Sequence, residues 1–142
     1  MNLKAKFYRD SSRVEPVNEY INGLPVDHQV AIDDKIDMLN KLDDEHPHLA
    51  FPHSSQVEGS LRELRCQYGP NRYRIFYQRS DEFLMLLHII RKSSEKLPKT
   101  DLDLAKARFA DFKERMNAVP KKPPSPTGRK APPRPRAKAK KS

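Results

Sequence analysis

Basic and aromatic side chains alternate along residues 61–99 of this 142-residue chain. The basic side chains are Arg62, Arg65, Arg72, Arg74, Arg79, Arg91, Lys92, Lys96 and Lys99. They are interleaved with Tyr68, Tyr73, Phe76, Tyr77 and His88. Guanidinium groups bind phosphate through paired N–H donors, and aromatic faces stack on bases. The pattern therefore predicts an RNA-binding groove, with the alternative that the arginines only keep edge strands soluble.

Metal-free cleavage of RNA requires three chemical roles, and this stretch has candidates for them. One group activates the 2′-hydroxyl, one holds the charge of the pentacoordinate phosphate, and one protonates the leaving oxygen. Arg65, Arg74 and Lys92 can hold the charge. His88 suits proton transfer, because an unperturbed imidazole titrates near neutral pH. Two other side chains can replace it: Tyr77 and Lys96. The alternative for His88 is a half-buried histidine of a central strand with no chemical role.

The predicted phosphate-binding residues are Arg65, Arg72, Arg91 and Lys96. Whether they share a face with the predicted catalytic residues depends on the turn between two strands. With a turn of two or four residues, alternation places on one face Arg72, Arg74 and Arg91. The other face then carries Tyr73, Tyr77, His88 and Lys92. A bulge or an odd-length loop would merge the two sets, and the sequence leaves both arrangements open.

Other kinds of chemical site are not favoured. His46, His48 and His53 follow a run of acidic residues, but prolines stiffen this segment and no pair of ligands has helical i, i+4 spacing. Cys66 is the single cysteine, which excludes an internal disulfide and a CxxC metal knuckle, and its place in a strand indicates a core residue. No glycine-rich phosphate loop occurs. We predict no metal and no small-molecule cofactor.

The apolar pattern predicts an α+β fold in which a small antiparallel sheet carries the basic side chains. The expected order is a strand at 3–9, helices at 14–21 and from 24 onward, a loop at 45–60, strands at 61–67, 72–79 and 83–91, and a helix after 98. The two first helices form a hairpin. In the second of them Ile32, Ile36, Leu39 and Leu42 recur at helical spacing and form one buried stripe.

Charge is distributed unevenly along the chain. The total of 28 Lys and Arg against 19 Asp and Glu gives a net charge of +9. Residues 1–119 contain 19 residues of each sign, so the excess belongs to the last 23 residues. Within the first part, residues 1–60 have 6 basic and 11 acidic side chains, a net of −5, and residues 61–99 have 9 and 4, a net of +5. The folded part is therefore predicted to be neutral but polarised, with an acidic helical hairpin and a basic sheet.

The C-terminal residues are predicted to form a tail. We divide the chain into a folded domain at 1–118 and a disordered Pro/Lys/Arg-rich tail at 119–142, since that composition buries too little apolar surface to offset the entropy of ordering. Truncation after Val119 is expected to leave the fold and any active site intact. Because the longest apolar run, at 83–90, is too short to span a membrane, we expect a cytoplasmic protein without a membrane partner.

Several short motifs resemble a known family. The chain resembles the phage-derived HigB-like toxins of the RelE/ParE superfamily in five segments. They are LRELR at 61–65, RIFY at 74–77, LLH at 86–88, a Lys/Pro segment at 92–98 and AKAR at 105–108. The resemblance implies a type II toxin that cleaves mRNA on translating ribosomes and is neutralised by a helix-turn-helix antitoxin. The residues to which it assigns roles are Arg65, Arg74, Tyr77, Lys92 and Lys96.

The chain also departs from the pattern of these toxins. Ile89 and Ile90 follow His88 where a small residue and Phe are usual, and Ser93 stands at the position of a second lysine. These departures motivate an alternative, a non-catalytic ParE-like toxin that inhibits DNA gyrase. A third option is an inactive phage-derived remnant.

Overall fold

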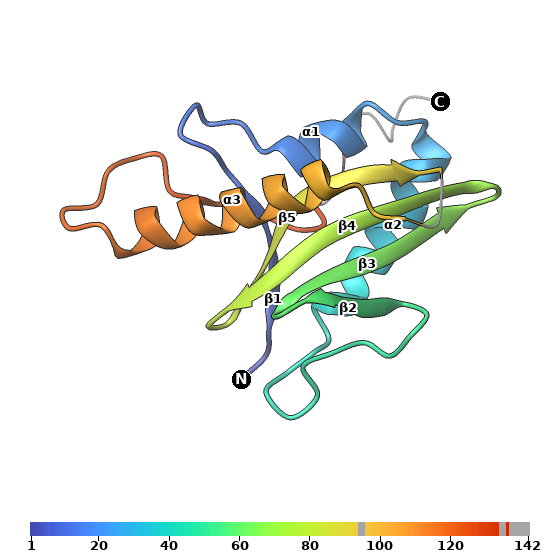
Figure 1. Ribbon diagram of the computed structural model, residues 1–142, viewed down its shortest axis with the longest axis horizontal. Coiled ribbons are helices and arrows are strands. Elements are labelled where there is room, and N and C mark those ends of the chain that lie inside the picture. Colours follow the sequence, from blue (N-terminus) through green and yellow to red (C-terminus); the bar gives the residue numbers. More distant parts are fainter. Residues whose placement is uncertain (94–95, 134–135, 137–142) are drawn as a thin grey trace.

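A six-stranded mixed sheet forms the centre of the fold in the computed structural model, which describes residues 1–93, 96–133 and 136 (Figure 1). The elements are β1 (Lys4–Tyr8), α1 (Pro16–Asn22), α2 (Val26–Leu39), β2 (Ser54–Glu58), β3 (Leu61–Tyr68), β4 (Asn71–Ser80), β5 (Phe83–Lys92), α3 (Lys99–Asn117) and β6 (Thr127–Lys130). The strand order is β2-β3-β4-β5-β1-β6, and β1 runs parallel to β5 while the other neighbours are antiparallel. The predicted α+β class and the three-stranded meander at its centre are confirmed.

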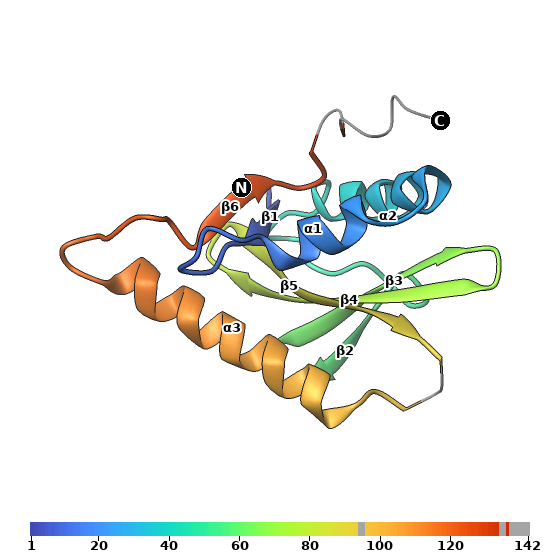
Figure 2. The same ribbon diagram turned by 90° about the horizontal axis from the view of Figure 1, so that it is seen from above.

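Helices cover both faces of the sheet. Figure 2 shows α1 and α2 on one side, here called the hairpin face, and α3 on the other, the α3 face. The hairpin face buries Ile32, Ile36 and Leu39 of the predicted stripe against strand residues such as Tyr73. A second apolar cluster packs Phe112 of α3 against Phe76 and other residues of the α3 face. The middle of the sheet is therefore buried on both sides, as the apolar sequence of β5 predicts.

Residues 45–60 differ from the prediction, because Ser54–Glu58 forms β2 rather than part of a loop. This edge strand pairs antiparallel with β3, and Ser54 is directly opposite Leu64. Its sequence, SSQVE, has few apolar residues because it is an edge strand that buries little apolar surface. Backbone pairing to β3 stabilises it, and a local sequence pattern does not reveal such pairing.

The predicted tail contains a strand as well. Thr127–Lys130 forms β6, which pairs antiparallel with β1 at the edge of the sheet. Ala131 and Arg136 further along are buried. The prediction of disorder is thus wrong for this part, because main-chain pairing and single polar contacts order it without an apolar core of its own. Residues 134–135 and 137–142 of the predicted tail lie outside the described residues.

Within the described residues, no helix has the length and apolar character needed to cross a membrane.

Candidate functional site

A β-bulge decides which predicted residues share a face. In the pairing of β4 with β5, Phe76 is opposite His88 but Tyr77 is opposite Leu86, so Leu87 is the extra residue. Leu87 belongs to the apolar cluster under α3, and the His88 ring stacks on Phe76 with a centroid distance of 6.2 Å. Both Leu87 and His88 therefore point to the α3 face. The bulge joins the two predicted sets only in part: His88 and Lys92 share the face of Arg72 and Arg74, while Arg91 lies with Tyr73 and Tyr77 on the other face.

Two rows of cross-strand neighbours on the α3 face bring the basic residues together. In one row Arg65 of β3 is opposite Arg74 of β4, and in the next row Arg72 of β4 is opposite Lys92 of β5. Alternation along β4 puts both rows on the same face as Phe76. Arg65, Arg72 and Lys92 are partly exposed, whereas Arg74 is buried. The four cations form a basic strip with one recessed and three accessible members.

Glu63 holds two of these arginines. Its carboxylate lies 3.3 Å from Nη1 of Arg65 and 3.5 Å from Nε of Arg74, and it accepts a hydrogen bond from Ser55 Oγ at 2.8 Å. Burial lowers the pKa of Arg74, the charge of Arg65 lowers it further, and Glu63 acts in the opposite direction. The carboxylate therefore compensates the close approach of two guanidinium groups. Arg65 also lies over the exposed ring of Phe51, 5.0 Å from its centroid.

His88 is held from both sides by α3. Its Nε2 is 2.7 Å from Asp101 Oδ1, and its Nδ1 is 3.2 Å from Nη1 of Arg108. A guanidinium group can only donate, so Nδ1 accepts and Nε2 carries the hydrogen that is donated to Asp101. Arg108 also donates to the carbonyl of Leu87. In this arrangement both ring nitrogens have protein partners, and the imidazole fixes the start of α3 over the sheet.

Tyr77 is not part of this group. It is opposite Arg62 on the hairpin face, where its side chain is buried and its hydroxyl is 2.7 Å from Ser54 Oγ. The structure thus separates Tyr77 from Arg74, although the two residues belong to the same RIFY segment. Their separation follows from the odd difference of three positions along a strand.

The remaining predicted residues are placed as follows. Arg91 is exposed and pairs with Tyr73 on the hairpin face, so it is separated from its neighbour Lys92. Lys96 is exposed in the segment between β5 and α3. Cys66 is a buried core residue as predicted, and burial raises the pKa of its thiol to about 12.

Sequence reasoning missed three residues that shape the site: Glu63, Asp101 and Arg108. Glu63 lies within LRELR and Arg108 within AKAR, so both residues belong to motifs that the sequence analysis identified. Their roles could not be predicted, because each has a partner on another element. Asp101 stands in the first helical turn, where an acidic residue is also expected for the helix dipole alone. No sequence feature distinguished this second role.

The fold and this face define a small α+β protein with a basic strip of sheet residues beside its long C-terminal helix. The model of the family described as phage derived protein Gp49-like (DUF891) matches residues 19–110, more than half of the chain, and the chain belongs to that family. It is a toxin-like family related to the RelE/ParE-type toxins. The match covers α2, the three central strands and most of α3, and therefore the whole basic strip. No curated protein matches the chain.

Proposed function

We propose that this chain is the toxin of a type II toxin–antitoxin system and acts as a ribosome-dependent mRNA endoribonuclease. The observation that carries the proposal is the basic strip, in which Arg65, Arg72, Arg74 and Lys92 of three neighbouring strands share one face. Such a strip fits the phosphate backbone of an extended RNA strand. Membership of a toxin-like family supports the same reading.

The proposed reaction uses the 2′-hydroxyl of the RNA as nucleophile and needs no metal. The 2′-oxygen forms a bond to phosphorus while the bond from phosphorus to the 5′-oxygen breaks, which leaves a 2′,3′-cyclic phosphate and a 5′-hydroxyl. The 2′-hydroxyl gives its proton to a water molecule, and the leaving 5′-oxygen gains a proton from the protein. Arg65 and Arg74 stabilise the charge of the pentacoordinate phosphate, and a lysine ammonium, Lys92 or Lys96, supplies the proton to the leaving oxygen.

His88 has a different role in this proposal from the one that its residue type predicts. Since Asp101 and Arg108 engage its two nitrogens, it acts as a positioning residue that keeps α3 beside the strip. Tyr77 has no role at the phosphate, because it lies on the hairpin face. The partners in this proposal are the ribosome with its mRNA, and a helix-turn-helix antitoxin that neutralises the toxin.

The test is induced expression in bacteria with mapping of mRNA 5′ ends. Wild-type protein is expected to arrest growth and to cut mRNAs only where they are translated. Arg65→Gln and Lys92→Gln should each lower cleavage by about 100-fold, as loss of one group that stabilises a transition-state charge does. Arg91→Gln is the matched control, because Arg91 is next to Lys92 in sequence but on the opposite face. Intact mRNA and continued translation in arrested cells would rule the proposal out.

A second candidate is a non-catalytic toxin that inhibits DNA gyrase. Two observations favour it: both nitrogens of His88 have protein partners, and Tyr77 lies on the face opposite the strip. This candidate predicts growth arrest with intact mRNA, induction of DNA-damage signalling, and inhibition of supercoiling by purified gyrase. Absence of any growth arrest would instead indicate an inactive phage-derived remnant.

A further inference from the structure

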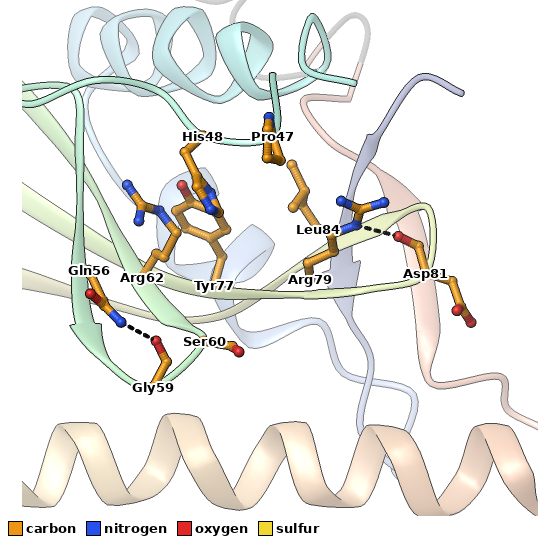
Figure 3. Close-up of a pocket in the computed structure, with 10 residues that line it drawn as sticks. All are labelled: Pro47, His48, Gln56, Gly59, Ser60, Arg62, Tyr77, Arg79, Asp81 and Leu84. Carbon is orange, nitrogen blue, oxygen red and sulfur yellow. Dashed lines mark hydrogen bonds between the residues drawn. The ribbon is translucent and has the colours of Figure 1, made fainter. Parts of the chain in front are cut away.

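A cavity of about 530 Å³ opens on the hairpin face, between the segment that follows α2, the turn from β2 to β3, and strands β3 and β4 (Figure 3). Arg62 and Tyr77, a cross-strand pair, line it. The next pair along the strands, Glu63 and Phe76, points to the α3 face. The cavity is therefore separated from the basic strip by the sheet itself, and the proposed cleavage reaction does not use it.

Arg62 is fixed in this cavity by two hydrogen bonds. Its Nε donates to Ser54 Oγ at 3.2 Å, and its Nη2 donates to the carbonyl oxygen of Leu49 at 3.4 Å. Ser54 is itself held by the hydroxyl of Tyr77. A guanidinium group has five N–H donors, and these contacts use two of them. Arg62 is thus oriented in advance, with donor capacity left for a ligand.

The cavity has a positive electrostatic character. His48 and Arg79 line it together with Arg62. Burial lowers the pKa of His48, and the charges of Arg62 and Arg79 lower it further, so both guanidinium groups act on the same space. Arg79 is paired with Asp44, whereas the Asp81 carboxylate extends away from the other lining residues in Figure 3. Among the described residues no carboxylate forms an ion pair with Arg62, so the positive charge of the cavity is centred on Arg62.

Apolar side chains complete the lining of the cavity. The ring of Tyr77, the side chain of Leu84 and the ring of Pro47 contribute to it. The volume is in the range of sites that take small molecules, and an apolar wall with a few fixed polar groups is typical of them. A ligand that combines an anionic group with a flat ring matches this lining.

We propose that this cavity binds a nucleotide-sized phosphate monoester, with its phosphate on Arg62 and its ring beside Tyr77 and Leu84. A phosphate group matches the paired N–H donors of the Arg62 guanidinium. A small anion alone would leave most of the cavity empty, whereas a phosphate with an attached sugar and ring would fill it. The phosphate can belong to a free nucleotide or to the 5′ end of an RNA. Their shared chemistry is a terminal phosphate, and the experiment distinguishes the two.

The test is calorimetric titration of the full chain with four ligands. These are adenosine 5′-monophosphate, adenosine, and an RNA trinucleotide with and without a 5′-phosphate. We expect the phosphorylated ligands to bind about tenfold or more tightly than their unphosphorylated counterparts. Arg62→Gln should remove most of this difference and Arg62→Lys should keep part of it. Lys41→Gln, at an exposed position outside the cavity, is the control for a lost charge and should change nothing.

An NMR titration of the His48 imidazole in the wild-type chain is the second measurement. It tests the proposal even if the Arg62 variants fail to fold. Binding of adenosine 5′-monophosphate to the wild-type chain should shift the His48 resonances and raise its pKa, since an anion then offsets the two guanidinium charges. Preference for the trinucleotide over the mononucleotide would identify an RNA end as the ligand. Equal affinity with and without phosphate, or His48 resonances that do not move, would overturn the proposal. Loss of mRNA cleavage affects none of these readouts, so the proposed function and this site can fail independently.

Discussion

His88 and Asp101 connect the central strand of the sheet to the first turn of α3, with 2.7 Å between Nε2 and Oδ1. Arg108, two turns further along the helix, binds the other ring nitrogen. The imidazole is therefore a link between sheet and helix on the same face as the basic strip. The histidine thus lies on the same face as the candidate RNA site, with both ring nitrogens engaged by groups of α3.

Two variants distinguish a positioning role of His88 from a role in proton transfer. His88→Ala should lower the free energy of unfolding by about 1–3 kcal/mol, because Asp101 and Arg108 lose a partly buried partner. His88→Gln can still donate to Asp101 and should lose less. In a cleavage assay neither variant should remove a limb of the pH–rate profile, since a positioning residue does not titrate in the reaction. Disappearance of the limb near neutral pH in both variants would assign proton transfer to His88.

Glu63 is expected to be more important for stability than an exposed glutamate. Glu63→Gln leaves the buried guanidinium of Arg74 and the partly buried Arg65 without their shared counter-charge. We expect a loss of about 1–3 kcal/mol in urea unfolding. Glu58→Gln, which breaks an exposed pair with Lys106, is the matched control and should stay within about 0.5 kcal/mol of wild type. Similar losses for both variants would contradict the proposed compensation.

The C-terminal segment should contribute to stability through Arg136. Its Nε and Nη2 donate to the Asp33 carboxylate at 2.6 and 2.8 Å, and its Nη1 donates to Asn18 at 2.8 Å. Arg136→Ala leaves these polar groups without a partner in a buried site, at a cost of about 3 kcal/mol by thermal or urea unfolding. Arg129→Ala is the control, because the Arg129 side chain is exposed.

Truncation after Val119 extends this test. The composition of the tail predicts that the truncated chain keeps its fold unchanged, whereas the pairing of β6 with β1 predicts lower stability. We expect faster amide hydrogen exchange at Arg9, whose main-chain N–H donates to the Pro126 carbonyl. Unchanged amide exchange and unfolding free energy after truncation would show that β6 does not stabilise the fold.

The alkaline limit of stability should depend on Tyr8. Burial raises the pKa of Tyr8, and the hydrogen bond from its hydroxyl to Asp111 raises it further. The native state therefore keeps the proton after the unfolded chain has lost it, near pH 10. The contribution of Tyr8 to the free energy of unfolding is complete below a pH of about 10 and is lost as the pH rises above that value. Tyr8→Phe should flatten the fall in unfolding free energy above about pH 10, and an unchanged slope would contradict this.

Much of the central fold could be predicted from local sequence. The helical spacing of Ile32, Ile36 and Leu39 identified the buried stripe of α2, and the apolar run at 83–90 identified a central strand. These predictions succeed because helix and strand periodicity follow from the backbone geometry of a single segment. The charge difference between residues 1–60 and 61–99 is also a property of sequence alone, and it indicated the sheet as the candidate site.

Other features required the assembled sheet. Strand β2 and strand β6 have few apolar residues, and each exists because a partner strand elsewhere in the chain supplies its hydrogen bonds. The contact between Arg136 and Asp33 joins residues 103 positions apart. No local pattern encodes such pairs, since either side chain would be unremarkable on an exposed surface.

The sequence by itself determined which residue types gather in the candidate site, and the tertiary structure decided which of them meet. Arg74, Tyr77, His88 and Lys92 were a plausible set by type, but alternation along β4 turns Tyr77 to the hairpin face. The bulge at Leu87 brings His88 and Lys92 to the side of Arg74. One inserted residue reverses the facing of every side chain beyond it, and its position depends on the register between two strands. Register is a property of the paired strands, so only the folded sheet settles it.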